Sequence, residues 1–204
     1  MDITKKGYYF IAIIVTLYVW VTILFFLNPI GGVEDYFIRL AVLYGFTSLF
    51  LTSIITPFMK EVYQMFGTSF IKIHHLFSIL GLVLITIHPI AFAISIGDPT
   101  AFIPIFYPWN TFWALAGRPA LYLIYIAVIA VLIRKHLNPK LWRILHGLNY
   151  VAFYFAYIHG AVIGDDFESL LGMITFTAMI VIVFEVLFYR RYQKYKLKQM
   201  KKNE

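Results

Sequence analysis

Long apolar runs separated by short polar segments dominate the pattern of hydrophobic and polar positions along the chain. A helix needs about 20 apolar residues to cross the roughly 30 Å hydrocarbon core of a bilayer. Six runs reach that length: 7–27, 39–59, 73–97, 112–133, 144–164 and 169–189. The fourth run admits Arg118 and the sixth admits Glu185. The pattern predicts an all-α integral membrane protein in which six transmembrane helices form a bundle.

Positive charges gather at alternate connections between these runs. Fifteen of the 17 Lys and Arg residues fall on one side of the membrane, and the other two, Arg39 and Arg118, lie at the opposite ends of the second and fourth runs. Because cytoplasmic loops are enriched in Lys and Arg, we expect both termini in the cytoplasm and the protein in a cell membrane. Segment 1–189 would be one membrane domain, and segment 190–204 a basic cytoplasmic tail that contacts anionic lipid.

Composition agrees with a lipid environment. The chain is 61% hydrophobic and 13% charged, whereas a soluble domain carries roughly twice that share of charge. The formal net charge of +7 therefore indicates membrane orientation and not a nucleic-acid partner. Cysteine is absent, which excludes disulfides, Cys-ligated iron–sulfur clusters and heme attachment through C-x-x-C-H.

Five of the six histidines fall inside predicted spans, where ionisable side chains are costly and usually functional. The third and fifth spans run in the same direction, and each carries a shallow and a deep histidine. At about 1.5 Å of rise per residue, the two depths are about 20 Å apart. Six-coordinate heme iron needs one imidazole on each face. We therefore expect two stacked bis-imidazole sites, one from each pair of matched depth: His74 or His75 with His146, and His88 with His159.

The spacing of the histidines supports a shared ligand face on the third span more clearly than on the fifth. Fourteen residues from His74 to His88 make four turns at the 3.5-residue period of a left-handed bundle, so the two rings share a face and His75 points elsewhere. Thirteen residues from His146 to His159 leave those rings about 100 to 140° out of register. Either the fifth span is overwound or tilted, or its ligands approach from different sides, or one heme is held by His88 and His159 alone.

Other interpretations of the histidines stay open. They could hydrogen-bond to the backbone or to one another in a polar seam. Zinc fits less well, because no acidic residue near them supplies a third ligand. The main rival to a redox function is a transporter or assembly scaffold with a histidine-lined polar path. Broken helices with paired internal repeats would favour that rival, and the sequence has neither.

Four motifs follow one another along the chain: Leu51 to Pro57, His74-His75-Leu76-Phe77-Ser78, Arg118-Pro119, and a segment that begins at Trp142-Arg143 and leads to His159. The last is the most specific, because it contains Leu-His-x-Leu-x-Tyr and a second histidine thirteen residues after the first. In this order the motifs resemble the ferric reductase-like transmembrane domain family. The similarity is greatest to the heme-binding subunits of bacterial methionine sulfoxide reductase systems. The family pattern puts His74 at the ligand position and His75 where arginine is usual.

The resemblance implies that electrons cross the membrane through heme b to an acceptor at the outer face. The implied ligands are His74, His88, His146 and His159. Arg39 and Arg118 could bind propionates of the outer heme, or could reach lipid phosphate instead. We expect Glu185, one turn inside Arg190, to pair with a neighbouring arginine.

The electron donor is expected to be a separate molecule. Larger members of the family continue into a flavin- and nicotinamide-binding domain, whereas this sequence runs 15 residues past Tyr189 and has no phosphate-cradling Gly-rich loop. A cytoplasmic flavin reductase or a membrane quinol would supply electrons, and a flavin or quinone could bind at the cytoplasmic side. The chain would then be an electron conduit that needs partner subunits, and not a complete enzyme.

Overall fold

The computed structural model describes residues 3–200, and within this range the chain is built from helices joined by short connections. This confirms the all-α prediction. Four helical segments are long and apolar enough to cross a bilayer: Lys5–Leu27 (α1), Tyr36–Phe66, Phe70–Ile96 (α4) and Leu170–Met200 (α8). Four such helices indicate a multi-pass membrane protein.

The segment Tyr36–Phe66 is not one regular helix. It begins with a π-helical turn, Tyr36–Leu40, continues as α2 (Ala41–Ile55), tightens into a 3-10 turn at Thr56–Phe58, and ends as α3 (Met59–Phe66). Pro57 lies in the tight turn, where its ring and missing N–H are incompatible with a regular helix. α2 therefore ends at Ile55, directly before Thr56 and Pro57, the last two residues of the Leu51 to Pro57 motif.

The fourth and fifth predicted spans correspond to α6 (Gly117–Leu132) and α7 (Pro139–Ile163). α6 is apolar but has only 16 residues, and it is preceded by the short helix α5 (Trp109–Ala114). α7 has 25 residues but is more polar, because it carries Lys140 and Arg143 in addition to its histidines. Neither meets the criteria of length and hydropathy that the other four segments meet, so the six-span bundle stays a prediction.

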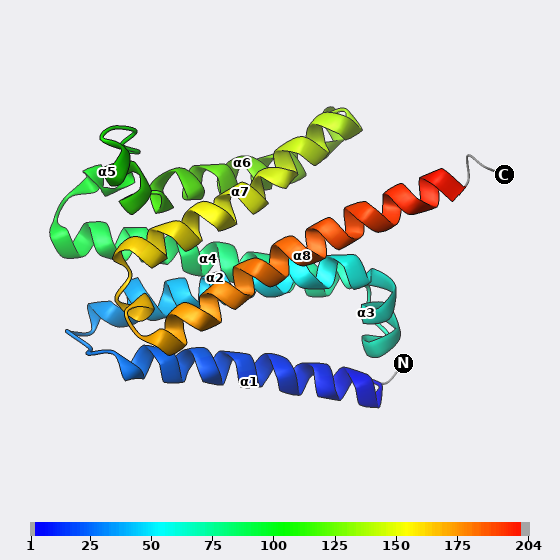
Figure 1. Ribbon diagram of the computed structural model, residues 1–204, viewed down its shortest axis with the longest axis horizontal. Coiled ribbons are helices and arrows are strands. Elements are labelled where there is room, and N and C mark those ends of the chain that lie inside the picture. The colour runs from blue at the N-terminus through cyan, green and yellow to red at the C-terminus, as the bar shows by residue number, and fades with distance from the viewer. Residues whose placement is uncertain (1–2, 201–204) are drawn as a thin grey trace.

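The long helices lie alongside one another (Figure 1). α2 packs along α4, and α6 packs along α7, with α1 and α8 beside them. The start of α1, α3, the α6–α7 turn and the end of α8 lie at one end of the molecule, on the right in Figure 1. We call this the basic end. The opposite end holds the α1–α2, α4–α5 and α7–α8 connections, and we call it the loop end.

Small residues let α2 and α4 approach closely. A Cβ atom on Gly45 would lie 2.6 Å from Cγ2 of Ile85, and one on Gly81 would lie 2.9 Å from Cγ of Leu49. Glycine at helix contacts is the usual device for close packing between membrane helices. The contact fixes the position of α4 against α2, and therefore the positions of His74 and His88.

α8 continues to Met200, beyond the end of the sixth predicted run at residue 189. Most residues after Tyr189 are Arg, Lys, Gln and Leu, which are good helix formers. Hydropathy therefore marks where the apolar run ends, and not where the helix ends. The last part of the predicted tail, 201–204, lies outside the described residues.

Candidate functional site

The deep histidines of α4 and α7 lie side by side near the loop end. The ring centroids of His88 and His159 are 6.4 Å apart, and the ring planes are inclined by 66°. A metal–imidazole nitrogen bond is about 2 Å long, so two imidazoles on opposite faces of one iron have centroids about 6 Å apart. The separation would suit a bis-imidazole iron site, and it also lies within the range of an edge-to-face pair of rings.

Both imidazoles are fixed through the same ring atom. Nδ1 of His88 is 2.6 Å from the carbonyl oxygen of Ile38, and Nδ1 of His159 is 2.6 Å from the carbonyl oxygen of Ala114. A carbonyl oxygen only accepts hydrogen bonds, so Nδ1 carries a proton in each ring, and in the neutral imidazole Nε2 keeps its lone pair. A backbone partner on one nitrogen is how metal-binding histidines are usually oriented.

The two carbonyl groups come from irregular or terminal backbone. Ile38 lies in the middle of the π-helical turn, where the N–H of Ala41 donates to the oxygen of Tyr36, five residues earlier. Such turns occur frequently at functional sites. Ala114 is the last residue of α5, and the last four carbonyl groups of a helix have no partner within it. Each histidine thus binds where a helix is irregular or ends.

Gly117 provides the space for the ring of His159. A Cβ atom on Gly117 would lie 2.7 Å from Cδ2 and 3.0 Å from Nε2 of His159. The first distance is too short for non-bonded atoms, so any other residue at this position would push the imidazole away. Gly117 is therefore part of the site, although it has no side chain.

The shallow histidines, His74 and His146, are both half-buried. Nδ1 of His74 is 3.4 Å from Oγ1 of Thr56. His75 is exposed, with its ring centroid 6.0 Å from that of His74. Of the two neighbouring residues, His74 is the more buried.

α7 is a continuous α-helix from Pro139 to Ile163, without a tightened turn inside it. His146 and His159 therefore project in different directions from α7. Of the alternatives for this span, the helix geometry favours ligands that approach from different sides over local overwinding.

Arg39 has partners other than the propionate that the sequence suggested. Its Nε and Nη2 donate to the two carboxylate oxygens of Asp166 at 3.2 and 2.8 Å, and Nη1 donates to the carbonyl oxygen of Pro29 at 2.6 Å. Arg39 is 7% exposed and Asp166 is 4% exposed. The pair joins the start of the second helical segment to the α7–α8 connection.

Arg118 binds backbone oxygens at the loop end. Its Nη1 donates to the carbonyl oxygens of Thr100 and Ile103 at 3.2 and 2.8 Å, which holds the α4–α5 connection against α6. The two arginines that were expected to bind propionates therefore brace connections in this structure. A role for either one at a heme stays a prediction.

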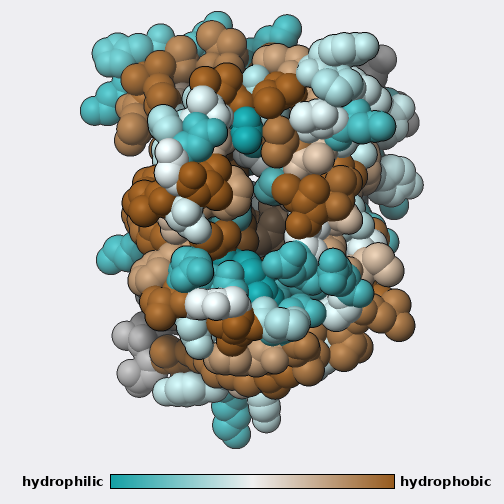
Figure 2. Space-filling model, turned by 90° about the vertical axis from the view of Figure 1, so that its left-hand side faces the viewer, coloured by the Kyte–Doolittle hydropathy of each residue, from teal (hydrophilic) through white to brown (hydrophobic). Residues whose placement is uncertain are grey.

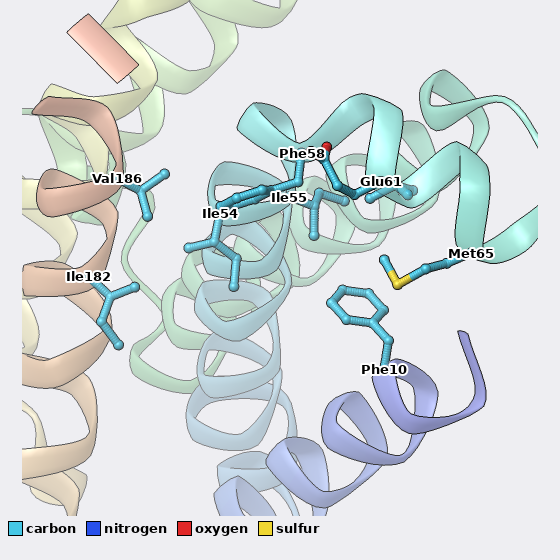
Figure 3. A pocket seen from close by; sticks show the side chains of 9 residues that line it. Phe10, Ile54, Ile55, Phe58, Glu61, Met65, Ile182 and Val186 are labelled. Atoms are coloured by element: carbon cyan, nitrogen blue, oxygen red, sulfur yellow. The ribbon is translucent and has the colours of Figure 1, made fainter. Parts of the chain in front are cut away.

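Two apolar cavities have linings that include none of the four histidines. One of about 350 Å³ lies at the basic end between α1, α2, α3 and α8, and Figure 3 shows Phe10, Phe58 and Met65 around it with Glu61 as its charged residue. The other, of about 460 Å³, lies between the π-helical turn and α4 and is lined by Phe37, among others. Within residues 3–200, no group of three or more His, Asp or Glu side chains is placed so that it could hold a metal ion.

Sequence reasoning missed several residues of the site. The carbonyl groups of Ile38 and Ala114 carry no side-chain signal, and Asp166 is 127 positions from the arginine that it binds. Gly117 directly precedes the Arg118-Pro119 motif. This position next to a motif is the one sequence feature that could have indicated Gly117 as a residue of the site.

Comparison of the chain with protein-family models, with curated proteins and with solved structures finds no match.

Proposed function

We propose that this chain is a membrane electron-transfer subunit that holds b-type heme between His88 and His159, and a second heme between His74 and His146. The observation that carries the proposal is the outer pair, in which two oriented imidazoles lie 6.4 Å apart and present unprotonated nitrogens. No hydrogen bond joins the two rings among the contacts of the described residues. A heme held between two imidazoles supplies one-electron transfer.

The residues present fit this group. All four histidines are half-buried, and neutral imidazole is a suitable axial ligand. Gly117 keeps the face of α6 flat against the ring of His159. Phe46 stacks on Phe153 between α2 and α7, with centroids 4.1 Å apart, so an aromatic contact lies on α7 between His146 and His159 in sequence.

The arrangement of the helices supports the proposal that six of them cross the membrane. α6 and α7 pack against each other and lie alongside the four long apolar segments (Figure 1), so we expect them to cross the same bilayer. Exposed Ile, Leu, Val and Phe side chains occur on α1, α4, α6, α7 and α8, as lipid contact requires, whereas the residues of α2 are buried or half-buried. The basic end carries most of the Lys and Arg residues, so the positive-inside rule puts it and both termini in the cytoplasm of a cell-membrane protein.

Electrons would enter at the basic end and leave at the loop end. The donor would be a cytoplasmic flavin protein or a membrane quinol, and the acceptor would be a separate protein or small molecule outside. Figure 2 looks onto the loop end and shows a hollow in the middle of this face, with hydrophilic residues along its edge. The outer histidine pair lies toward this end, within reach of an acceptor.

Absorption spectroscopy of the purified full chain tests the proposal. We expect a Soret band, a sharp α-band of the b type after addition of dithionite, and a pyridine hemochrome that reports up to two hemes per chain. A protein that stays colourless when hemin is supplied would contradict the proposal and would favour a histidine-lined transport path.

Substitution of Gly117 with alanine tests the geometry of the outer site. The new Cβ atom would displace the ring of His159, which cannot move freely because its Nδ1 is bound to the carbonyl oxygen of Ala114. We expect hemin affinity to fall about tenfold, the lower end of what disturbed ligand orientation costs at metal sites. A hemin titration followed at the Soret band measures it.

Gly147→Ala is the matched control. Nothing lies within 4 Å of a Cβ atom on Gly147, and alanine is the better helix former by about 1 kcal/mol. This variant should bind hemin as the unmodified chain does. Equal affinities in the two alanine variants would mean that Gly117 does not shape the site.

A further inference from the structure

The indole N–H of Trp142 is a hydrogen-bond donor without an acceptor. Among residues 3–200, its Nε1 is the buried side-chain nitrogen or oxygen that has no partner. Buried polar atoms in native proteins are nearly always paired, so an orphaned one requires an explanation. An indole only donates, and the missing partner is therefore an acceptor that the chain itself does not provide.

Trp142 belongs to the surroundings of the inner histidines. Its ring stacks on that of His146, one turn further along α7, with centroids 5.8 Å apart and planes inclined by 8°. The guanidinium carbon of Arg134 lies 4.5 Å from the centre of the Trp142 ring, on the side of the α6–α7 turn. The ring that carries the unpaired N–H thus lies near both a candidate heme ligand and a cation.

The charge around Trp142 indicates which kind of acceptor fits. Arg134 covers the ring, and Lys135, Lys140 and Arg143 are close in sequence at the same end of α6 and α7. Acidic residues are absent from the segment 117–164. A donor beside several cations selects an anionic oxygen, and hydrogen bonds to a charged acceptor are roughly twice as strong as those between neutral groups.

We propose that Trp142 donates its indole N–H to a carboxylate of the porphyrin held at the inner histidine pair, and so positions that group beside His146. This inference rests on the proposed function and adds a residue to it. Trp142 is a positioning residue in this account, because it acts on the substituent of the cofactor and not on the iron. A phosphate of a membrane lipid has the same chemistry as an acceptor, and the test separates the two.

The test compares two probes, hemin and hemin dimethyl ester, in which both carboxylates are esterified. Both are titrated into full-length His159→Ala protein, whose outer ligand is removed, so that binding reports the inner site. Trp142→Phe is then added, which keeps an aromatic ring but removes the donor. Trp20→Phe is the matched control, because the indole of Trp20 already donates to Oγ1 of Thr175 at 3.0 Å.

We expect Trp142→Phe to weaken hemin binding about tenfold, as the loss of one charge-assisted hydrogen bond implies. Its affinity for the dimethyl ester should stay unchanged, and Trp20→Phe should change neither. Equal weakening for both probes would mean that Trp142 supports only the fold, and no change for either would mean that its N–H does not reach the porphyrin. Both results overturn the inference. If a lipid phosphate or an Asp or Glu carboxylate accepts the N–H of Trp142, the substitution should affect hemin and its dimethyl ester equally, because those acceptors do not depend on the porphyrin's own carboxylates.

The inference and the proposed function fail in different ways. If the chain with no substitution binds no hemin, the proposed function is wrong. If that chain binds hemin but His159→Ala protein binds none, the outer site stands while the inner site and the role of Trp142 are wrong.

Discussion

Replacement of His88 or His159 with alanine is expected to remove the outer heme. Each ring supplies one of two axial nitrogens, and disturbance of a metal site usually costs about 10- to 100-fold in affinity even when the ligand itself is kept. Loss of an entire ligand should exceed that range. Pyridine hemochrome assay of the purified variants measures the heme that stays bound per chain.

The double variant makes this prediction sharper. If His88 and His159 bind one iron, the two substitutions together should remove no more heme than either does alone, because residues that act as a unit are not additive. His88→Ala with His74→Ala should instead remove both hemes. His136→Ala is the control, because His136 is exposed in the α6–α7 turn. Equal heme content in all these variants would exclude the assigned pairs.

The second large effect is expected at the ion pair of Arg39 and Asp166. Asp166→Ala would leave the guanidinium buried without its bidentate partner, and breaking a buried pair in this way typically costs about 3 to 5 kcal/mol. We expect the free energy of unfolding in detergent to fall by about that amount. The connection between α7 and α8 should also become susceptible to proteolysis, because the pair holds it in place.

Asp165→Ala is the matched control for this substitution. Asp165 is adjacent, and its carboxylate is 3.9 Å from Nε of Arg39, but its side chain is 67% exposed. Exposed pairs contribute about 0 to 1 kcal/mol, so stability should change little. If the double variant Arg39→Met, Asp166→Leu recovers stability, the loss comes from the unpaired charge and not from a general defect. Similar stability of the two alanine variants would contradict the role of the buried pair.

Hydropathy alone predicted the helices that face lipid. The runs 7–27 and 73–97 correspond closely to α1 and α4, because a lipid-facing helix must be apolar along its whole length. The start of α7 at Pro139 was missed, although the local signal was present. Asn138 accepts a hydrogen bond from the N–H of Leu141 and is followed by proline, which is a common way to begin a helix. A search for apolar runs ignores such caps.

The proximity of His88 and His159 was predictable from depth, whereas the backbone groups that orient their rings were not. Counting residues along two helices that run in the same direction is enough to match His88 with His159, because each helix has a fixed rise per residue. The backbone partners Ile38 and Ala114 depend on a π-helical turn and on a helix end, and neither has a distinct sequence signal. Arg39 was expected at a propionate because its partner in the fold, Asp166, is remote in sequence.

Electron paramagnetic resonance of the oxidised, purified chain tests the central claim most directly, because it reports which atoms bind the iron. We predict low-spin ferric heme with two imidazole ligands. The 66° inclination of the rings of His88 and His159 predicts a strongly anisotropic signal that disappears in His159→Ala protein. High-spin iron alone, or a signal that His159→Ala leaves intact, would contradict the account.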